Sequence, residues 1–261
     1  MRVEVSDISL NISDDGPPNA PAVVFAHPLG LDLRVWDAVC TQLPKNLRLV
    51  RYDARGHGAS DVPPAPYRMG QLVTDAEQVL DALTIKDAVF VGAGYGGLVA
   101  QGLAVKRLDQ LRAMVLCGTA AKLSPPATWD HRIQQIKTGG MDAAANILAA
   151  RSFTRSGRDT PKAQSLTDVL RHTPPEGYIA SCNAISGTDF YTPTSGLRLP
   201  SLGLCGIDDR ISPPDLMRET IELIPGAQFK LIRRSGHYPM IESPEVFADY
   251  LCDFLKGIGH L

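Results

Sequence analysis

The 261-residue sequence predicts a single α/β domain with a mostly parallel sheet covered by helices on both faces. Short apolar runs of strand length alternate with segments of helical periodicity, which is typical of parallel sheets. The composition is 44% hydrophobic and 21% charged, which suits a domain that buries a full core. The length fits one α/β unit that carries an insertion.

Six apolar runs are expected to form buried parallel strands, because turn-forming or polar residues follow most of them. They are residues 22–27, 47–53, 87–94, 111–118, 201–206 and 228–234. Two short antiparallel strands are expected before them, near the N-terminus.

Helical patterns separate most of these runs. Seven apolar residues in the segment 69–83 recur at steps of three and one, which places them on one face of a helix. Ser212-Pro213 and Ser243-Pro244 are expected to begin two later helices, with the serine hydroxyl as the cap and proline in the first turn.

One region interrupts the alternation of strand and helix. Residues 120–196 contain proline clusters and helical patterns but no convincing strand. The expected organisation is a core of residues 1–119 and 197–261, with a helical cap of residues 120–196 over the carboxyl edge of the sheet.

Charge and cysteine content narrow the possible functions. The net charge is −2 and the basic residues are scattered singly, which argues against a nucleic-acid partner. No apolar run approaches the roughly 20 residues of a membrane span, and the first residues do not resemble a signal peptide, so a cytoplasmic protein without membrane partners is expected. The five cysteines are widely spaced, which favours reduced thiols over disulfides or a metal site.

The ends of the predicted strands carry the residues suited to catalysis, since open α/β sheets bind ligands at this edge. The segment GAGYG (residues 92–96) would be the Gly-x-Ser-x-Gly turn of a nucleophile if serine replaced Gly94. Asp208 and Asp209 follow a later strand, and His237 follows the last one. This order of turn, acid and histidine is that of α/β-hydrolases.

Each of these residues has an expected role. His237 would be the general base, because imidazole titrates near neutral pH. Asp209 would orient its ring, and Asp208 is the competing candidate, otherwise a solvated turn carboxylate. The backbone N–H groups of Tyr95 and Leu29 would hold an oxyanion.

Two further histidines lie near the same strand ends. His27 is expected either to form a wall of the pocket or to support its own loop. His57, in DARGHGAS (residues 53–60), is expected to have a structural role in a tight loop beside the cleft.

Several stretches together resemble the 3-oxoadipate enol-lactonase group of the α/β-hydrolase fold, nearly from end to end. They are residues 52–67, 118–133 and 173–185 and the surroundings of Asp209 and His237. The resemblance implies hydrolysis of the enol-lactone formed late in aromatic-ring degradation, which gives 3-oxoadipate without a metal or organic cofactor. A carboxylesterase or carbon–carbon bond hydrolase of the same fold is the alternative, and a non-catalytic small-molecule binder is another.

The substrate of that group carries a free carboxylate. Arg132, in Trp129-x-x-Arg132, is the candidate to bind it, because a guanidinium can hold a carboxylate through two parallel hydrogen bonds. The alternative is a cap arginine that faces solvent. Trp129 is expected at the same place, more for packing than for recognition.

Gly94 leaves the turn without a nucleophile, because no oxygen is present to attack a carbonyl. Three explanations are open. The chain is an altered form in which a serine was exchanged for glycine to trap a ligand, or a natural variant in which His237 activates a water molecule. The third explanation is a non-catalytic binder or a relative that catalyses a different reaction. Under the first explanation the parent is a serine-type hydrolase and this chain is nearly inert.

Overall fold

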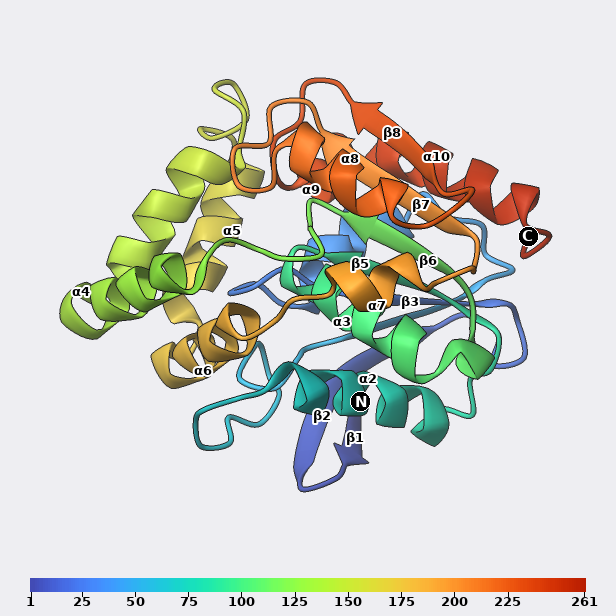
Figure 1. Ribbon diagram of the computed structural model, residues 1–261, viewed down its shortest axis with the longest axis horizontal. Helices are drawn as coiled ribbons and strands as arrows, with labels where there is room; N and C mark the ends of the chain where they lie inside the picture. Colours follow the sequence, from blue (N-terminus) through green and yellow to red (C-terminus); the bar gives the residue numbers. More distant parts are fainter.

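The computed structural model describes residues 1–261 and contains one eight-stranded sheet (Figure 1). The strands are β1 (Arg2–Val5), β2 (Ile8–Asp15), β3 (Ala22–Ala26), β4 (Arg48–Tyr52), β5 (Ala88–Ala93), β6 (Leu111–Cys117), β7 (Ser201–Gly206) and β8 (Gln228–Ile232). Their order in the sheet is β1-β2-β4-β3-β5-β6-β7-β8. The pairs β1–β2 and β2–β4 are antiparallel and the others are parallel, which confirms the predicted fold class.

Helices and short helical turns connect the strands. They are η1 (Leu33–Trp36), α1 (Asp37–Cys40), α2 (Met69–Ala82), α3 (Tyr95–Lys106), η2 (Leu108–Gln110), α4 (Pro126–Ser152), α5 (Pro161–His172), α6 (Pro175–Ser186), α7 (Tyr191–Ser195), α8 (Pro214–Glu222), α9 (Pro239–Glu242) and α10 (Pro244–Gly257).

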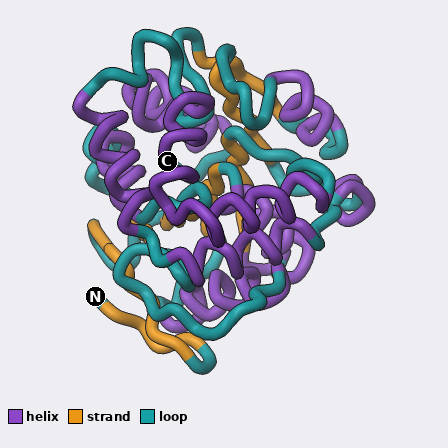
Figure 2. Tube along the Cα trace, turned by 90° about the vertical axis from the view of Figure 1, so that its left-hand side faces the viewer, coloured by secondary structure: helices purple, strands orange, loops and turns teal.

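The strands bury side chains on both faces of the sheet, because successive residues of a strand point in opposite directions. In β5, Phe90 packs in one apolar core with residues of α2, α3 and α8. Val89 and Val91 pack in a second core with residues of α1 and α10. Figure 2 shows helices in front of and behind the strands. Helices therefore cover both faces of the sheet, which gives a three-layer core.

The segment between β6 and β7 contains four helices and no strand. We call α4, α5 and α6 the cap; α4 packs on both α5 and α6, and the three lie to one side of the sheet in Figure 1. Helix α4 breaks at Gly140, whose φ of 66° and ψ of −173° are not helical. The boundaries predicted for a separate cap, residues 120–196, stay a prediction.

Two predicted helix starts are correct, but the capping proposed for them is wrong. Helices α8 and α10 begin at Pro214 and Pro244, and neither has a side-chain cap. The residue before α8 is Pro213, so Ser212 lies outside the cap position. The hydroxyl of Ser243 instead pairs with Ser235, at 2.8 Å. Proline in the first turn was the informative signal.

The cysteines are unpaired, as the sequence predicts, and Cys117, Cys182 and Cys205 are buried. Burial raises the pKa of Cys182 to about 12, so this thiol stays protonated at neutral pH. None of the helices combines the length and the apolar character that crossing a membrane requires.

Candidate active site

The chain turns sharply at Gly94, between β5 and α3, with φ 50° and ψ −113°. A backbone with this sign of φ favours glycine. The Gly94 N–H donates to the carbonyl of Cys117 at 2.9 Å, and its own carbonyl accepts from Thr119 Oγ1 at 2.7 Å. A Cβ on Gly96 would overlap the backbone carbonyl of Ala26 in β3, so helix and sheet approach too closely there for a larger residue. The turn is thus fixed by hydrogen bonds and by close packing.

Gly94 faces His237 across open space. A Cβ built on Gly94 would lie 3.5 Å from Nε2 of His237, and no other atom is nearer to it. The hydroxyl of a serine at this position could therefore reach Nε2 at hydrogen-bond distance. The turn has room for the side chain that it lacks.

His237 is held by Asp209 from the next strand end. Nδ1 of His237 lies 2.9 Å from Oδ2 of Asp209, whose side chain is completely buried. Oδ1 of Asp209 accepts from the N–H groups of Ile211 and Ser212, at 2.8 and 2.9 Å. Because the carboxylate accepts a hydrogen bond from a protonated Nδ1, Nε2 is left as an acceptor toward Gly94. Asp208 is exposed, so the structure brings Asp209 to the histidine.

Leu29 and Tyr95 lie at the same place. Both line the cavity that contains Gly94 and His237. Neither backbone N–H donates a hydrogen bond within the protein. Tyr95 is the first residue of α3, and the first N–H groups of a helix have no intrahelical acceptor. Two donors are therefore available beside Gly94.

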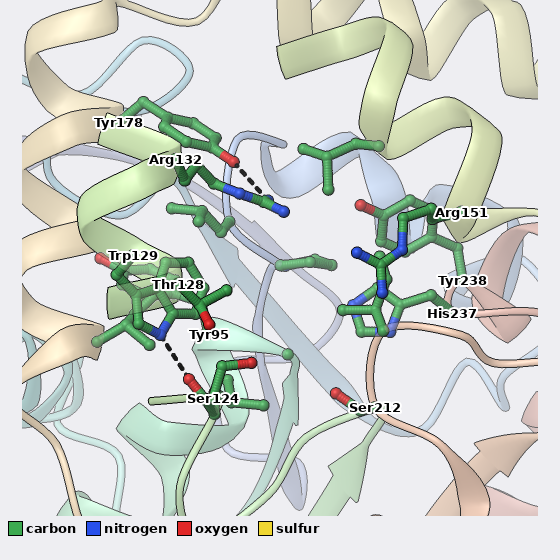
Figure 3. Close-up of a pocket in the computed structure, with 17 residues that line it drawn as sticks. Tyr95, Ser124, Thr128, Trp129, Arg132, Arg151, Tyr178, Ser212, His237 and Tyr238 are labelled. Carbon is green, nitrogen blue, oxygen red and sulfur yellow. Dashed lines mark hydrogen bonds between the residues drawn. The ribbon is translucent and has the colours of Figure 1, made fainter. Parts of the chain in front are cut away.

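The cavity has a volume of about 320 Å³ and extends from this turn to the cap (Figure 3). Trp129 and Arg132 line it from α4. Nε1 of Trp129 donates to the carbonyl of Leu123 at 2.5 Å, which fixes the indole in the wall. The guanidinium of Arg132 lies 5.7 Å from the Trp129 ring centroid and donates to the Tyr178 hydroxyl at 3.3 Å. Arg132 therefore faces the cavity.

No other side chain takes the place of the missing hydroxyl. Ser124, Ser212 and Tyr238 line the cavity, but none of their hydroxyl groups is hydrogen-bonded to His237. None of the five cysteines lines it.

Comparison with known proteins places this geometry in a family. A family model described as the alpha/beta hydrolase family matches residues 23–250. The chain belongs to the alpha/beta hydrolase family. This hydrolase is 30% identical to 3-oxoadipate enol-lactonase 2 of Acinetobacter baylyi, over 92% of the chain and 91% of the relative. It is 31% identical to 3-oxoadipate enol-lactonase 1 of the same bacterium, over 96% of the chain and 94% of the relative.

Solved structures agree with these relatives. The hydrolase superposes on the enol-lactonase from Burkholderia xenovorans LB400 with a TM-score of 0.94 and 34% identity, over 98% of this chain and 100% of the other. It superposes on a malate-bound thermophilic esterase from Thermogutta terrifontis with a TM-score of 0.93 and 28% identity, over 99% of both chains. The predicted resemblance is confirmed, and the relatives support ester or lactone hydrolysis as the chemistry of this scaffold.

His27 does not form a wall of the cavity in this hydrolase, which corrects one of its two expected roles. Its Nε2 accepts from the N–H of Ala54 at 2.9 Å, and its Nδ1 lies 2.8 Å from the carbonyl of Pro28. Both ring nitrogens are occupied and the side chain is buried, so the residue joins two loops. His57 is also buried, with Nδ1 3.1 Å from the carbonyl of Arg55, and stays outside the cavity.

Arg151 is a further residue of this site that the sequence pattern did not indicate. It lies in the last turn of α4, lines the cavity and points toward the side of His237 (Figure 3). A continuous helix would carry it far from Arg132, so only the Gly139-Gly140 pair could have indicated a change of direction between the two arginines.

Proposed function

We propose that this scaffold hydrolyses a carboxylic ester or lactone when serine stands at position 94, with 3-oxoadipate enol-lactone as the substrate. The chain with Gly94 binds such ligands but cannot form an acyl-enzyme. The observation that carries the proposal is the 3.5 Å between a Cβ on Gly94 and Nε2 of a histidine already paired with Asp209.

The mechanism follows from the positions of these groups. His237 takes the proton of the serine hydroxyl as its oxygen attacks the lactone carbonyl. The N–H groups of Leu29 and Tyr95 hold the oxyanion. His237 then gives the proton to the ring oxygen as the carbon–oxygen bond breaks. In the second half His237 deprotonates a water molecule that attacks the acyl-enzyme, and Asp209 stabilises the imidazolium in both halves.

The cap supplies the preference for an acidic substrate. Arg132 has no carboxylate partner within the protein, and it faces the cavity from the wall opposite His237 (Figure 3). A carboxylate of the substrate would form charge-assisted hydrogen bonds with it. Two enol-lactonases among the relatives and the malate bound by one similar esterase support an acidic ligand.

A second proposed activity belongs to the unmodified chain, in which His237 activates a water molecule directly. The observation that favours it is that Nε2 of His237 faces the cavity without a hydrogen-bond partner. This reaction would need no serine, and it would leave a slow hydrolysis that disappears in His237→Ala.

The test is the hydrolysis of the enol-lactone by the unmodified chain and by Gly94→Ser. We expect the substitution to raise kcat/KM at least ~100-fold, as the loss of a triad nucleophile typically costs orders of magnitude. Gly94→Ala is the matched control, because it adds the same Cβ without the oxygen. Adding His237→Ala to Gly94→Ser should abolish the gain.

Two results would contradict the proposal. An increase equal in Gly94→Ala and Gly94→Ser would show that the hydroxyl is not responsible. If Gly94→Ser hydrolysed neutral acetate esters better than the enol-lactone, the scaffold would be a general esterase and not a lactonase.

Gly94→Ala and Gly94→Ser should each lose about 1–3 kcal/mol in the free energy of unfolding, because a Cβ is strained at this positive φ.

A further inference from the structure

A second arginine reaches the cavity beside the reacting position. Arg151 lines the cavity on the His237 side, whereas Arg132 lines it beside Tyr178 (Figure 3). Nη2 of Arg151 donates to the carbonyl of Arg210 at 3.0 Å, which anchors one end of the guanidinium to the loop that carries Asp209. This is the only hydrogen bond that the Arg151 side chain makes, so its other N–H groups are free.

The break in α4 is what brings the two arginines to one cavity. They are separated by 19 positions, which an unbroken helix would spread over about 28 Å along its axis. The helix instead changes direction at Gly140, whose backbone conformation is accessible almost only to glycine. Each half of α4 thereby supplies one arginine.

The charge of the cavity is not balanced within the protein. No aspartate or glutamate is among its 17 lining residues. Neither arginine has a carboxylate within ion-pair distance, although the chain contains fourteen pairs of arginine or lysine with acidic residues. Arg171, for example, pairs with both Asp142 and Asp168. Guanidinium groups stay ionised at all relevant pH values. Two positive charges, on the half-buried Arg132 and the exposed Arg151, therefore border one cavity without a carboxylate partner in the protein.

We propose that this cavity is a dicarboxylate site. Arg132 binds one carboxylate at the cap, and Arg151 binds the second beside Gly94, where the N–H groups of Leu29 and Tyr95 are also free. This inference deepens the proposed function by naming the ligand class. It predicts a linear diacid such as adipate as a ligand of the chain as it stands.

The second carboxylate has a chemical origin in lactone hydrolysis. An acidic lactone brings one carboxylate. When water adds to the lactone carbonyl and the ring carbon–oxygen bond breaks, the attacked carbon becomes a second carboxylate and one proton is released. That carbon lies beside Gly94 and His237 in the proposed mechanism. Arg151 is thus a residue that distinguishes the open diacid from the closed lactone.

The experiment compares the affinities of adipate and monomethyl adipate for the unmodified chain by isothermal titration calorimetry. We expect adipate to bind at least about tenfold more tightly, because a charged hydrogen-bonded contact is lost in the ester. Arg151→Gln and Arg132→Gln should each reduce this preference to less than about threefold. Arg155→Gln is the control with the same change of charge, since Arg155 is exposed and lies outside the cavity.

Comparing two ligands within each variant keeps the result independent of folding. Arg151 also anchors the Arg210 loop, so Arg151→Gln could weaken both ligands equally; only the ratio of their affinities tests the contact. Equal affinities in the unmodified chain, or an unchanged ratio in Arg151→Gln, would overturn the proposal. The measurement involves no turnover, so a failure of Gly94→Ser to hydrolyse the lactone would be a separate result.

Discussion

The backbone N–H of His237 donates a 2.7 Å hydrogen bond to the carbonyl of Ser152, the last residue of α4. The loop of the candidate base is therefore attached to the cap. Glu242 strengthens the same junction. Its Oε2 accepts from the N–H of Gly236 at 2.7 Å, and its Oε1 accepts from the N–H and the hydroxyl of Thr154 at 3.0 and 2.6 Å.

Glu242→Gln should damage this junction. A glutamine amide presents one oxygen and one N–H₂ group, so it cannot accept from Gly236 and Thr154 together. We expect a loss of about 1–3 kcal/mol in the free energy of unfolding, the usual cost of an unsatisfied buried donor. In the Gly94→Ser background kcat should fall more than KM rises, because the base is displaced while Arg132 is not. Glu245→Gln, on the exposed first turn of α10, is the control.

Urea unfolding and steady-state kinetics measure these two effects. If Glu242→Gln and Glu245→Gln behaved alike in both assays, the carboxylate would have no part in placing His237.

Gly140→Ala should destabilise the cap. Nothing lies within 4 Å of a Cβ added there, so the cost comes from the positive φ of 66° alone and should be about 1–3 kcal/mol. Gly70→Ala is a matched control, because its Cβ also meets open space but its backbone is helical. We expect that control to be neutral or slightly stabilising. Adipate affinity should fall in the first variant only; retained affinity and stability in Gly140→Ala would contradict the role of the break.

Stability should fall in mild acid because His57 is buried without charge. Burial, together with nearby His27, lowers the pKa of His57 to about 3, whereas an unfolded histidine titrates near 6.5. Between these values the unfolded state binds a proton that the folded state excludes, so stability decreases as the pH falls below about 6.5. The slope approaches about 1.4 kcal/mol per pH unit for each such histidine.

Urea unfolding from pH 7.5 to 5 measures this slope. His57→Gln should reduce it, while His131→Gln, on the exposed part of α4, should leave it unchanged. Burial also lowers the pKa of His27, so part of the slope should persist in His57→Gln. The same slope in all three proteins would show that His57 is not the group that titrates.

The sequence predicted the parallel strands closely, because each is an apolar run that ends at a turn. The run 87–94, for example, forms a strand over Ala88–Ala93. The juxtaposition of Asp209 and His237 was predictable too, since parallel strands place their carboxyl ends at one edge of a sheet.

What the sequence could not predict depends on backbone angles and on hydrogen bonds between distant segments. Arg151 follows Arg132 in a single helical pattern, and one non-helical residue decides that both face the cavity. His27 stands at a strand end like a catalytic residue, but its ring nitrogens are taken by Ala54 and Pro28. The choice among hydrogen-bond partners does not change the periodicity of the sequence, so no sequence pattern could have shown it.

The positions of β5 and β8 in the sheet determine which part of the site would open first when the protein begins to unfold. Strand β5, which leads to Gly94, lies between β3 and β6, whereas β8, which leads to His237, has only β7 beside it. Fluctuations that open a sheet begin at strands with one neighbour. Fraying would therefore detach the imidazole from its carboxylate while the central turn is still intact. Function would be lost before the core melts, and amide exchange would begin at the rim.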